Sequence, residues 1–359
     1  MTDILIVGGG LIGMLSAIEF HRAGASVQIL ERSQMGGESS WAGGGILSPL
    51  YPWRYDDAVN VLAKYGHQYY PQIAQQLYDA GGVDPEYIRS GLIVLDQDES
   101  EQAAAWSQQW QMELACVQAS SIETQLNAKY GEALYMPGIG QLRNPRLVKS
   151  LKAALKAYGI HYQEQAQVEH LHVEHSHIRG VSAAGKKHSA DKVIIAGGAW
   201  SADIIKQYAA APKVEPVKGQ MIVFKGRPEI LKSIVLSGGR YLIPRRDGRI
   251  VVGSTLEFKG FDKNIDDAAH HDLRRAAIEI LPLLDRIEIE KQWAGLRPGS
   301  AHGVPYICEH PEINGLFINA GHFRNGVIMG AASARLMADI VLKREAIVDS
   351  QAYSFGINH

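Results

Sequence analysis

Cysteine is nearly absent from the sequence. The 359 residues include only two, Cys116 and Cys308, and these stand at no metal-ligand spacing. Their number argues against a disulfide framework. So few thiols are typical of proteins from a reducing compartment, and we expect the protein in the cytoplasm.

An excess of charge of one sign and long apolar runs are also missing. Lys and Arg number 36 against 38 Asp and Glu, a formal net charge of -2, so no basic field exists to attract nucleic acid. No stretch approaches the roughly 20 consecutive apolar residues that span a bilayer. The apolar start lacks a basic leader, carries Asp3 and is broken by Gly8–Gly10, which is not typical of a signal peptide. We expect neither a nucleic-acid partner nor a membrane.

The composition is that of an ordinary globular protein, with 46% hydrophobic and 21% charged residues. The length suggests two domains. Patterns typical of a parallel α/β sheet occur in three separate stretches, and hairpin-like patterns lie between them. We therefore predict an α/β fold. A Rossmann-like nucleotide-binding domain would be assembled from residues 1–85, 140–215 and 298–359, and a second, α+β domain with an antiparallel sheet from 86–139 and 216–297.

Hydrophobic spacing and turn residues predict the main elements. Asn144 is expected to cap a helix over 144–158 whose first residue is Pro145. Asp247-Gly248 predicts the turn of a hairpin over 241–256. Further helices are predicted over 57–80, 99–114 and 326–342 and from Ser201 onward, and buried strands over 193–196 and 316–319.

A glycine fingerprint lies between the first predicted strand, Asp3–Val7, and the first predicted helix, Leu11–Ala23. In Gly8-x-Gly10-x-x-Gly13, the first glycine permits a tight turn and the second lets the backbone approach a pyrophosphate. The third lets the helix pack on the strand. The helix N-terminus then offers unpaired N–H groups and a partial positive charge, so this junction predicts a dinucleotide site.

Glu31 follows the next predicted strand, Val27–Leu30, about 20 residues after the fingerprint. A carboxylate at this place can accept hydrogen bonds from ribose hydroxyls, and it disfavours the 2′-phosphate of NADP. A lone fingerprint would be weak, but here strand, helix, second strand and acidic residue agree.

Two further segments concern the length of the cofactor. A polar, glycine-rich loop follows the first βαβ unit, from Ser39 to Ile46, and Val193–Ser201 is a second strand–Gly-Gly–helix junction. Each alone could be an ordinary loop. Together they favour a cofactor longer than one nucleotide that is wrapped by several segments.

Six motifs, in this order, resemble the D-amino-acid-oxidase-type family of FAD oxidoreductases: VGGGLIG, GGESSWAGGGIL, VIIAGGAWS, YLIPRRDGRIVVGST, WAGLRPGS and AGHFRNGV. The likeness spans nearly the whole chain and is greatest to the glycine oxidase branch of the thiamine pathway. It implies an FAD-binding domain, a substrate-binding second domain, a small amino acid and molecular oxygen as reactants, and a homo-oligomer, in this branch a homotetramer.

The resemblance also implies which residues contact FAD. The segment His322–Ile328 would line the flavin ring, and because Gly326 precedes a long predicted helix, the helix dipole could stabilise negative charge on reduced flavin. Some relatives attach flavin through a cysteine, but Cys308 is displaced from that position, so we expect non-covalent FAD. With the fingerprint, the predicted cofactor residues are Gly8, Gly10, Leu11, Ile12, Gly13, Glu31, Arg32, Ser39, Ser40, Gly44, Gly45, Ile46, Val168, His322, Phe323, Arg324, Asn325, Gly326, Val327 and Ile328.

Three residues are candidates for substrate binding and catalysis. Arg297 stands between apolar residues and Pro298, an unusual setting for a solvated arginine, and its planar fork suits a carboxylate. The resemblance makes it the carboxylate clamp; a structural ion pair is the alternative. The resemblance also directs the Tyr241 hydroxyl to the substrate carboxylate and makes Arg324 a second substrate- or flavin-side arginine. Ordinary packing, in a strand and at a helix entry respectively, is the alternative for both.

Two positions depart from the glycine oxidase pattern. Gly239 replaces a histidine, which could widen the substrate pocket, and Leu256 replaces a methionine of nearly equal volume. The preference for glycine is therefore left open. The segment Tyr51–Asp57 could cover the site, but nothing in the sequence decides this.

A cluster of histidines invites a metal site, but its alternation with Leu171 and Val173 is typical of a strand with one wet face, and we predict no metal site. The histidines are His161, His170, His172, His175 and His177.

These observations predict an oxidase of small amines. Hydride passes from the substrate Cα to FAD, the imine hydrolyses to an α-keto acid and ammonia, and oxygen reoxidises the flavin to give hydrogen peroxide. Glycine is the leading substrate, followed by sarcosine and small D-amino acids. The alternatives are a dehydrogenase of the same fold with another electron acceptor, and a non-catalytic flavin-binding module.

Overall fold

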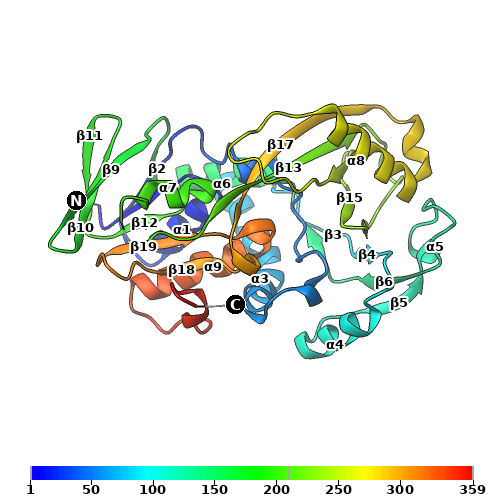
Figure 1. Cartoon of the computed structure of the whole chain (residues 1–359), viewed down its shortest axis with the longest axis horizontal. Helices are drawn as coiled ribbons and strands as arrows, with labels where there is room; N and C mark the ends of the chain where they lie inside the picture. The colour runs from blue at the N-terminus through cyan, green and yellow to red at the C-terminus, as the bar shows by residue number, and fades with distance from the viewer. Residues whose placement is uncertain (1, 209, 358–359) are drawn as a thin grey trace.

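The computed structural model describes residues 2–208 and 210–357, and two large β-sheets organise them (Figure 1). The first sheet has the strand order β18-β19-β12-β1-β2-β8, and it is parallel except for β18, which pairs antiparallel with β19. Its strands are β1 (Ile4–Val7), β2 (Val27–Leu30), β8 (His161–Gln163), β12 (Val193–Ile195), β18 (Tyr306–Glu309) and β19 (Leu316–Ala320).

Both faces of this sheet are covered, as its buried central strands require. On β1, Ile4 and Ile6 join the helical core, whereas Leu5 and Val7 face the opposite layer. The helical layer consists of α1 (Leu11–Arg22), α3 (Asp57–Gly81), α6 (Asn144–Ala157) and α9 (Gly326–Val341). The opposite layer consists of a three-stranded antiparallel sheet, β9 (Val168–Glu174), β10 (His177–Ala183) and β11 (Lys186–Ser189), together with α7 (Ser201–Ile205).

The second sheet lies beside the first and has the order β17-β13-β16-β15-β14-β4-β6-β5 (Figure 1). It is antiparallel except where β14 runs parallel to β4. Helix α4 (Ser100–Trp110) packs on one face and α8 (Asp267–Ile280) on the other. Its strands are β4 (Leu92–Val94), β5 (Ala115–Gln118), β6 (Glu132–Met136), β13 (Glu215–Phe224), β14 (Ile234–Ser237), β15 (Arg240–Pro244), β16 (Ile250–Gly253) and β17 (Ile289–Gly299).

Short elements connect the two regions. A two-stranded ladder joins β3 (Ile88–Arg89) to β7 (Gly140–Gln141), and α2 (Ser39–Ala42) lies in the glycine-rich loop. The short helix α5 (Ala119–Ile122) follows β5.

The predicted mixed α/β fold is confirmed, with two corrections at helix ends. Helix α4 ends at Trp110 and not at residue 114, because Gln111 adopts the left-handed conformation with φ 56. Asn144 does not cap α6; it is the first residue of that helix, the cap position belongs to Arg143, and the Asn144 side chain points elsewhere. The predicted hairpin is present as β15 and β16, with Gly248 at φ 86 in its turn.

Candidate active site

A single cavity of about 550 Å³ is lined by both sheet regions. This volume lies within the range of roughly 300–1,000 Å³ that is usual for sites of small ligands and cofactors. The first region contributes the fingerprint, the glycine-rich loop and the start of α9, and the second contributes residues of β13, β15 and β17. Predicted cofactor and substrate residues therefore meet in one place.

At the fingerprint, two glycines are enforced by close backbone contacts. Gly8 has φ 116, and a Cβ added there would lie 2.3 Å from the Ala196 carbonyl oxygen. A Cβ on Gly13 would lie 2.0 Å from the Gly8 oxygen, because helix α1 packs tightly on β1. Gly8 and Gly10 line the cavity, and Gly13 serves the packing behind it.

Glu31 directly follows β2, is only 8% exposed and lines the cavity. Its two oxygens accept hydrogen bonds from the backbone N–H groups of Gly9 (2.7 Å) and Ser33 (2.8 Å). These bonds fix the carboxylate, and a carboxylate oxygen can accept further hydrogen bonds from ribose hydroxyls. Beside it, the Arg32 guanidinium lies 3.5 Å from the centre of the Trp200 ring and pairs with Glu38 at 2.9 Å.

The glycine-rich loop is held against two helix N-termini. The Ser40 hydroxyl accepts a hydrogen bond from the Leu11 N–H (2.8 Å), one of the unpaired donors at the start of α1. The Asn144 amide donates to the Ser40 carbonyl oxygen (2.7 Å), which explains why it caps no helix. A Cβ on Gly43 or Gly45 would lie 2.6 Å from the Asn144 side chain, so these glycines permit the contact.

At the start of α9, the 3₁₀ helix Phe323–Asn325 turns the chain into the cavity. The His322 Nε2 lies 2.8 Å from the Ser333 hydroxyl, and burial lowers the pKa of His322 to about 3, so the ring is neutral at physiological pH. Asn325 and Ile328 are buried behind the cavity wall. The members of the predicted flavin segment that line the cavity are His322, Phe323, Arg324, Gly326 and Val327.

The remaining predicted cofactor residues also line the cavity: Leu11, Ile12, Arg32, Ser39, Ser40, Gly44, Gly45, Ile46 and Val168.

Arg297 stands on β17 and faces the cavity without a carboxylate partner among the described residues. Its guanidinium donates to the Ser254 hydroxyl (2.6 Å) and to the carbonyl oxygen of Thr255 (3.3 Å). Burial lowers the pKa of Arg297, nearby Tyr241 opposes this shift, and the positive charge of Arg324 adds to it. A partly buried cation without a counter-ion is a costly arrangement that an anionic ligand would relieve.

Tyr241 and Arg324 line the same cavity. Tyr241 is buried on β15, and its hydroxyl lies 3.7 Å from the Met221 sulfur, a weak acceptor. The Arg324 side chain makes no hydrogen bond or ion pair with any residue in the ranges described. The guanidinium groups of Arg297 and Arg324 and the Tyr241 hydroxyl are therefore available to bind one carboxylate.

Neither position that departs from the glycine oxidase pattern lines the cavity. The Gly239 N–H donates to the Tyr51 hydroxyl (3.1 Å), and Leu256 is 47% exposed to solvent. The segment Tyr51–Asp57 is also absent from the lining. It is fixed to α4, since the Trp53 indole donates to the Glu99 carboxylate (2.5 Å).

Sequence reasoning missed several residues of the substrate end. Gly219 lies under the Arg297 guanidinium, where a Cβ would come within 2.4 Å of three of its atoms. A glycine inside a strand run often marks such a close approach, and this signal could have identified it. Ser48, Leu50, Met221 and Ser254 also line the cavity, and no motif announces them.

The residues present fit FAD. Asn319 lines the cavity, and its Oδ1 is buried without a partner among the described residues. Buried polar atoms are normally hydrogen-bonded, so this oxygen suits a ligand that donates a hydrogen bond. Cys116 and Cys308 are both outside the lining, so neither is placed to bond the flavin. The described residues contain no group of three or more His, Cys, Asp or Glu placed to hold a metal ion.

Comparison with known proteins agrees with this geometry. The model of the FAD dependent oxidoreductase family matches residues 3–340. The glycine oxidase of Pseudomonas putida is 44% identical over 356 residues, which cover 98% of each chain. The crystal structure of glycine oxidase from Geobacillus kaustophilus matches with a TM-score of 0.94 and 28% identity, over 100% of this chain and 99% of that one.

A longer relative, the bifunctional protein ThiO/ThiG of Trichormus variabilis, is 28% identical over 96% of this chain but only 53% of its own length. No helix among the described residues is long and apolar enough to cross a bilayer. The cavity, the glycines that line it and these matches together show that the chain belongs to the FAD dependent oxidoreductase family of the D-amino-acid-oxidase type and is an FAD-dependent amino-acid oxidase.

Proposed function

We propose that the protein catalyses oxidative deamination of glycine and, with lower preference, of sarcosine and small D-amino acids. One molecule each of amine, oxygen and water give the α-keto acid, ammonia (methylamine from sarcosine) and hydrogen peroxide. The observation that carries the proposal is the partly buried Arg297, which has no carboxylate partner among the described residues and shares its cavity with Tyr241, Arg324 and the predicted FAD-binding loops.

In this mechanism the residues of the chain bind and orient the substrate. Arg297 holds the carboxylate through two parallel hydrogen bonds, the Tyr241 hydroxyl donates a third, and Arg324 adds positive charge. When bound, FAD supplies a hydride acceptor toward which the Cα–H must point. Orientation of this kind can contribute several kcal/mol to the rate.

The amine must lose its proton before hydride transfer, and the substrate end offers no base for this. The described lining residues of β13, β15, β17 and the Phe323–Asn325 helix include no carboxylate, and His322 is neutral with its Nε2 engaged by Ser333. The amine is therefore deprotonated by solvent, and the activity should rise with pH toward the pKa of the free amine.

A peroxide-coupled assay across glycine, sarcosine, D-alanine and D-proline tests the proposal. We expect peroxide with glycine and a lower turnover with bulkier amines. Flavin that is bleached under anaerobic conditions, without peroxide in air, would identify a dehydrogenase that uses another acceptor. A flavin that no amine bleaches would identify a non-catalytic flavin-binding module.

We also infer that the product serves synthesis of the thiamine thiazole. Support comes from the ThiO/ThiG relative, in which a chain of this kind is joined to a second segment of similar length. Deletion of the gene should create a growth requirement for the thiazole, and normal growth without it would contradict the inference.

A homo-oligomeric state is proposed as well. Four large apolar side chains are exposed along one loop, Leu256, Phe258, Phe261 and Ile265, and such surfaces favour association. Light scattering during gel filtration should give a multiple of the chain mass.

Both cysteines are free, which suits the proposed cytoplasmic location.

A further inference from the structure

Arg245 is a buried arginine that the proposed chemistry does not use. It follows β15 directly, four residues after Tyr241, and is 7% exposed. Its guanidinium donates to Gly44 O (2.6 Å), Gln141 Oε1 (2.8 Å) and Leu142 O (3.0 Å). No carboxylate among the described residues forms an ion pair with it. Burial and the neighbouring Arg143 lower its pKa to about 10, so it stays charged at neutral pH.

The acceptors of Arg245 tie the cofactor loop to the strand of Tyr241. Gly44 lines the cavity, and a Cβ added there would lie 2.8 Å from Ile243 Cδ1 and 3.3 Å from Tyr241 Cε2. The Leu142 N–H also donates to the Gly45 carbonyl oxygen (2.8 Å). The short hydrogen bond from the charged Arg245 to Gly44 therefore fixes the distance between the glycine-rich loop and the Tyr241 ring.

The same bond orients the next amide. In a trans peptide the C=O and N–H point in opposite directions, so the Gly45 N–H is directed away from Arg245. Gly45 is buried and lines the cavity, and its N–H has no partner among the described residues. A buried donor of this kind is costly unless a ligand accepts its hydrogen bond.

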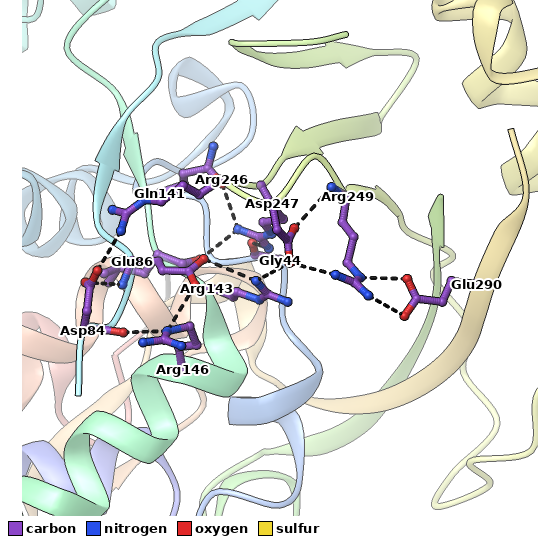
Figure 2. Close-up of polar contacts among 12 residues, drawn as sticks. Gly44, Asp84, Glu86, Gln141, Arg143, Arg146, Arg246, Asp247, Arg249 and Glu290 are labelled. Atoms are coloured by element: carbon purple, nitrogen blue, oxygen red, sulfur yellow. Dashed lines mark hydrogen bonds and ion pairs between the residues drawn. The ribbon is translucent and has the colours of Figure 1, made fainter. Parts of the chain in front are cut away.

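Figure 2 shows the charged residues that surround this contact, with Asp247 between Arg143 and Arg249. Arg143 reaches from the start of α6 to Asp247 (2.8 Å), and Arg249 continues the chain of contacts to Glu290 (2.7 Å). These pairs are partly exposed, and each is expected to contribute little on its own. These ion pairs hold the turn between β15 and β16, whereas the Arg245 guanidinium donates to Gly44 in the glycine-rich loop.

We propose that Arg245 is a positioning residue that fixes the Gly44–Gly45 peptide. In this position the Gly45 N–H binds the cofactor, and the Tyr241 hydroxyl reaches the substrate carboxylate. The part that concerns Tyr241 rests on the proposed function, whereas the part that concerns FAD does not.

The test compares Arg245→Lys and Arg245→Met with the matched control Arg246→Met. Arg246 is the next residue, its side chain is 55% exposed, and it makes one ion pair, with Asp84. FAD affinity of the apoprotein is measured by quenching of flavin fluorescence, together with the visible spectrum of bound flavin and the melting temperature of the apoprotein. Both Arg245 variants should raise the Kd for FAD at least tenfold and shift the flavin spectrum, and the control should stay within twofold of wild type.

With whichever amine the wild type oxidises, KM should rise severalfold in Arg245→Lys when activity is expressed per bound flavin. A lower melting temperature with unchanged FAD affinity and spectrum would show a merely structural role and overturn the proposal. Failure of both variants to give folded apoprotein would overturn it too. If the wild type oxidises no amine, the FAD measurements still decide the cofactor part.

Discussion

The two ends of the cavity are built by different means. The cofactor end is shaped mostly by the backbone: glycines allow close approach, residues at the start of α1 and α9 line the cavity, and Glu31 is fixed by backbone donors. At the substrate end, side chains from β15 and β17 and from the start of α9 converge, and their relative position depends on strand register.

This difference predicts different responses to substitution. Changes at the cofactor end should act through backbone displacement and FAD affinity, with amine recognition following indirectly. Changes at the substrate end should act on KM more than on FAD binding, because Arg297 stands on β17 and Tyr241 meets the glycine-rich loop only by packing against Gly44.

The largest effect is expected for Arg297→Lys. Lysine keeps the charge but cannot form two parallel hydrogen bonds, so kcat/KM for glycine should fall roughly 100-fold, which corresponds to about 3 kcal/mol of lost charged hydrogen bonding. Most of the fall should be in KM, measured by the peroxide assay. The Kd for FAD should not change, and an unaltered KM would refute the role of Arg297 as the carboxylate clamp.

Gly8→Ala should break the cofactor end. The added Cβ would overlap the Ala196 carbonyl and also demand φ 116, so we expect a loss of about 2–3 kcal/mol in stability and a marked rise in the Kd for FAD. The matched control is Gly24→Ala, which has φ 85 but nothing within 4 Å of the new Cβ. Equal FAD affinity in the two variants would mean that the tight turn at Gly8 does not serve the cofactor.

His322 lies near the junction of the two ends and should make stability depend on pH. Its pKa is lowered to about 3, against about 6.5 in an unfolded chain, so the unfolded state binds the additional proton between these values. With respect to this group, the free energy of unfolding is therefore highest above pH 6.5. It decreases as the pH falls, and it is lower by about 2 kcal/mol at pH 5. Denaturant midpoints at pH 7.5 and 5 should differ less in His322→Gln than in the wild type; an equal difference would contradict the buried neutral ring.

The smallest effect is expected for Tyr241→Phe. It removes one hydroxyl hydrogen bond to the substrate carboxylate, worth about 1 kcal/mol, so KM should rise roughly fivefold while the flavin spectrum stays the same. If KM is unchanged, Tyr241 only packs against Met221 and the loop, and the carboxylate is held by arginine alone.

The sequence allowed the cofactor end to be predicted because its signals are local. Gly8, Gly10, Gly13 and Glu31 lie within one βαβ unit, where chain spacing alone sets the geometry. The fold class followed for the same reason, since apolar runs and turn residues specify each element separately.

The substrate end could be predicted only in part. Arg297 was recognisable by its apolar setting, but Ser254 and Met221 come to it through pairing of β13 with β16 and β17, which no local pattern specifies. A position in a hairpin likewise does not tell which side chains face the cavity.

The central claim is that one cavity binds FAD and also holds the carboxylate of the substrate. Its most direct test is anaerobic mixing of the FAD-loaded protein with glycine or with glycinamide, which lacks the carboxylate. We predict that glycine bleaches the flavin absorbance and that glycinamide does so at least 100-fold more slowly, because Arg297 and Tyr241 have no anion to hold. Equal rates for the two amines, or no bleaching by glycine, would contradict the account.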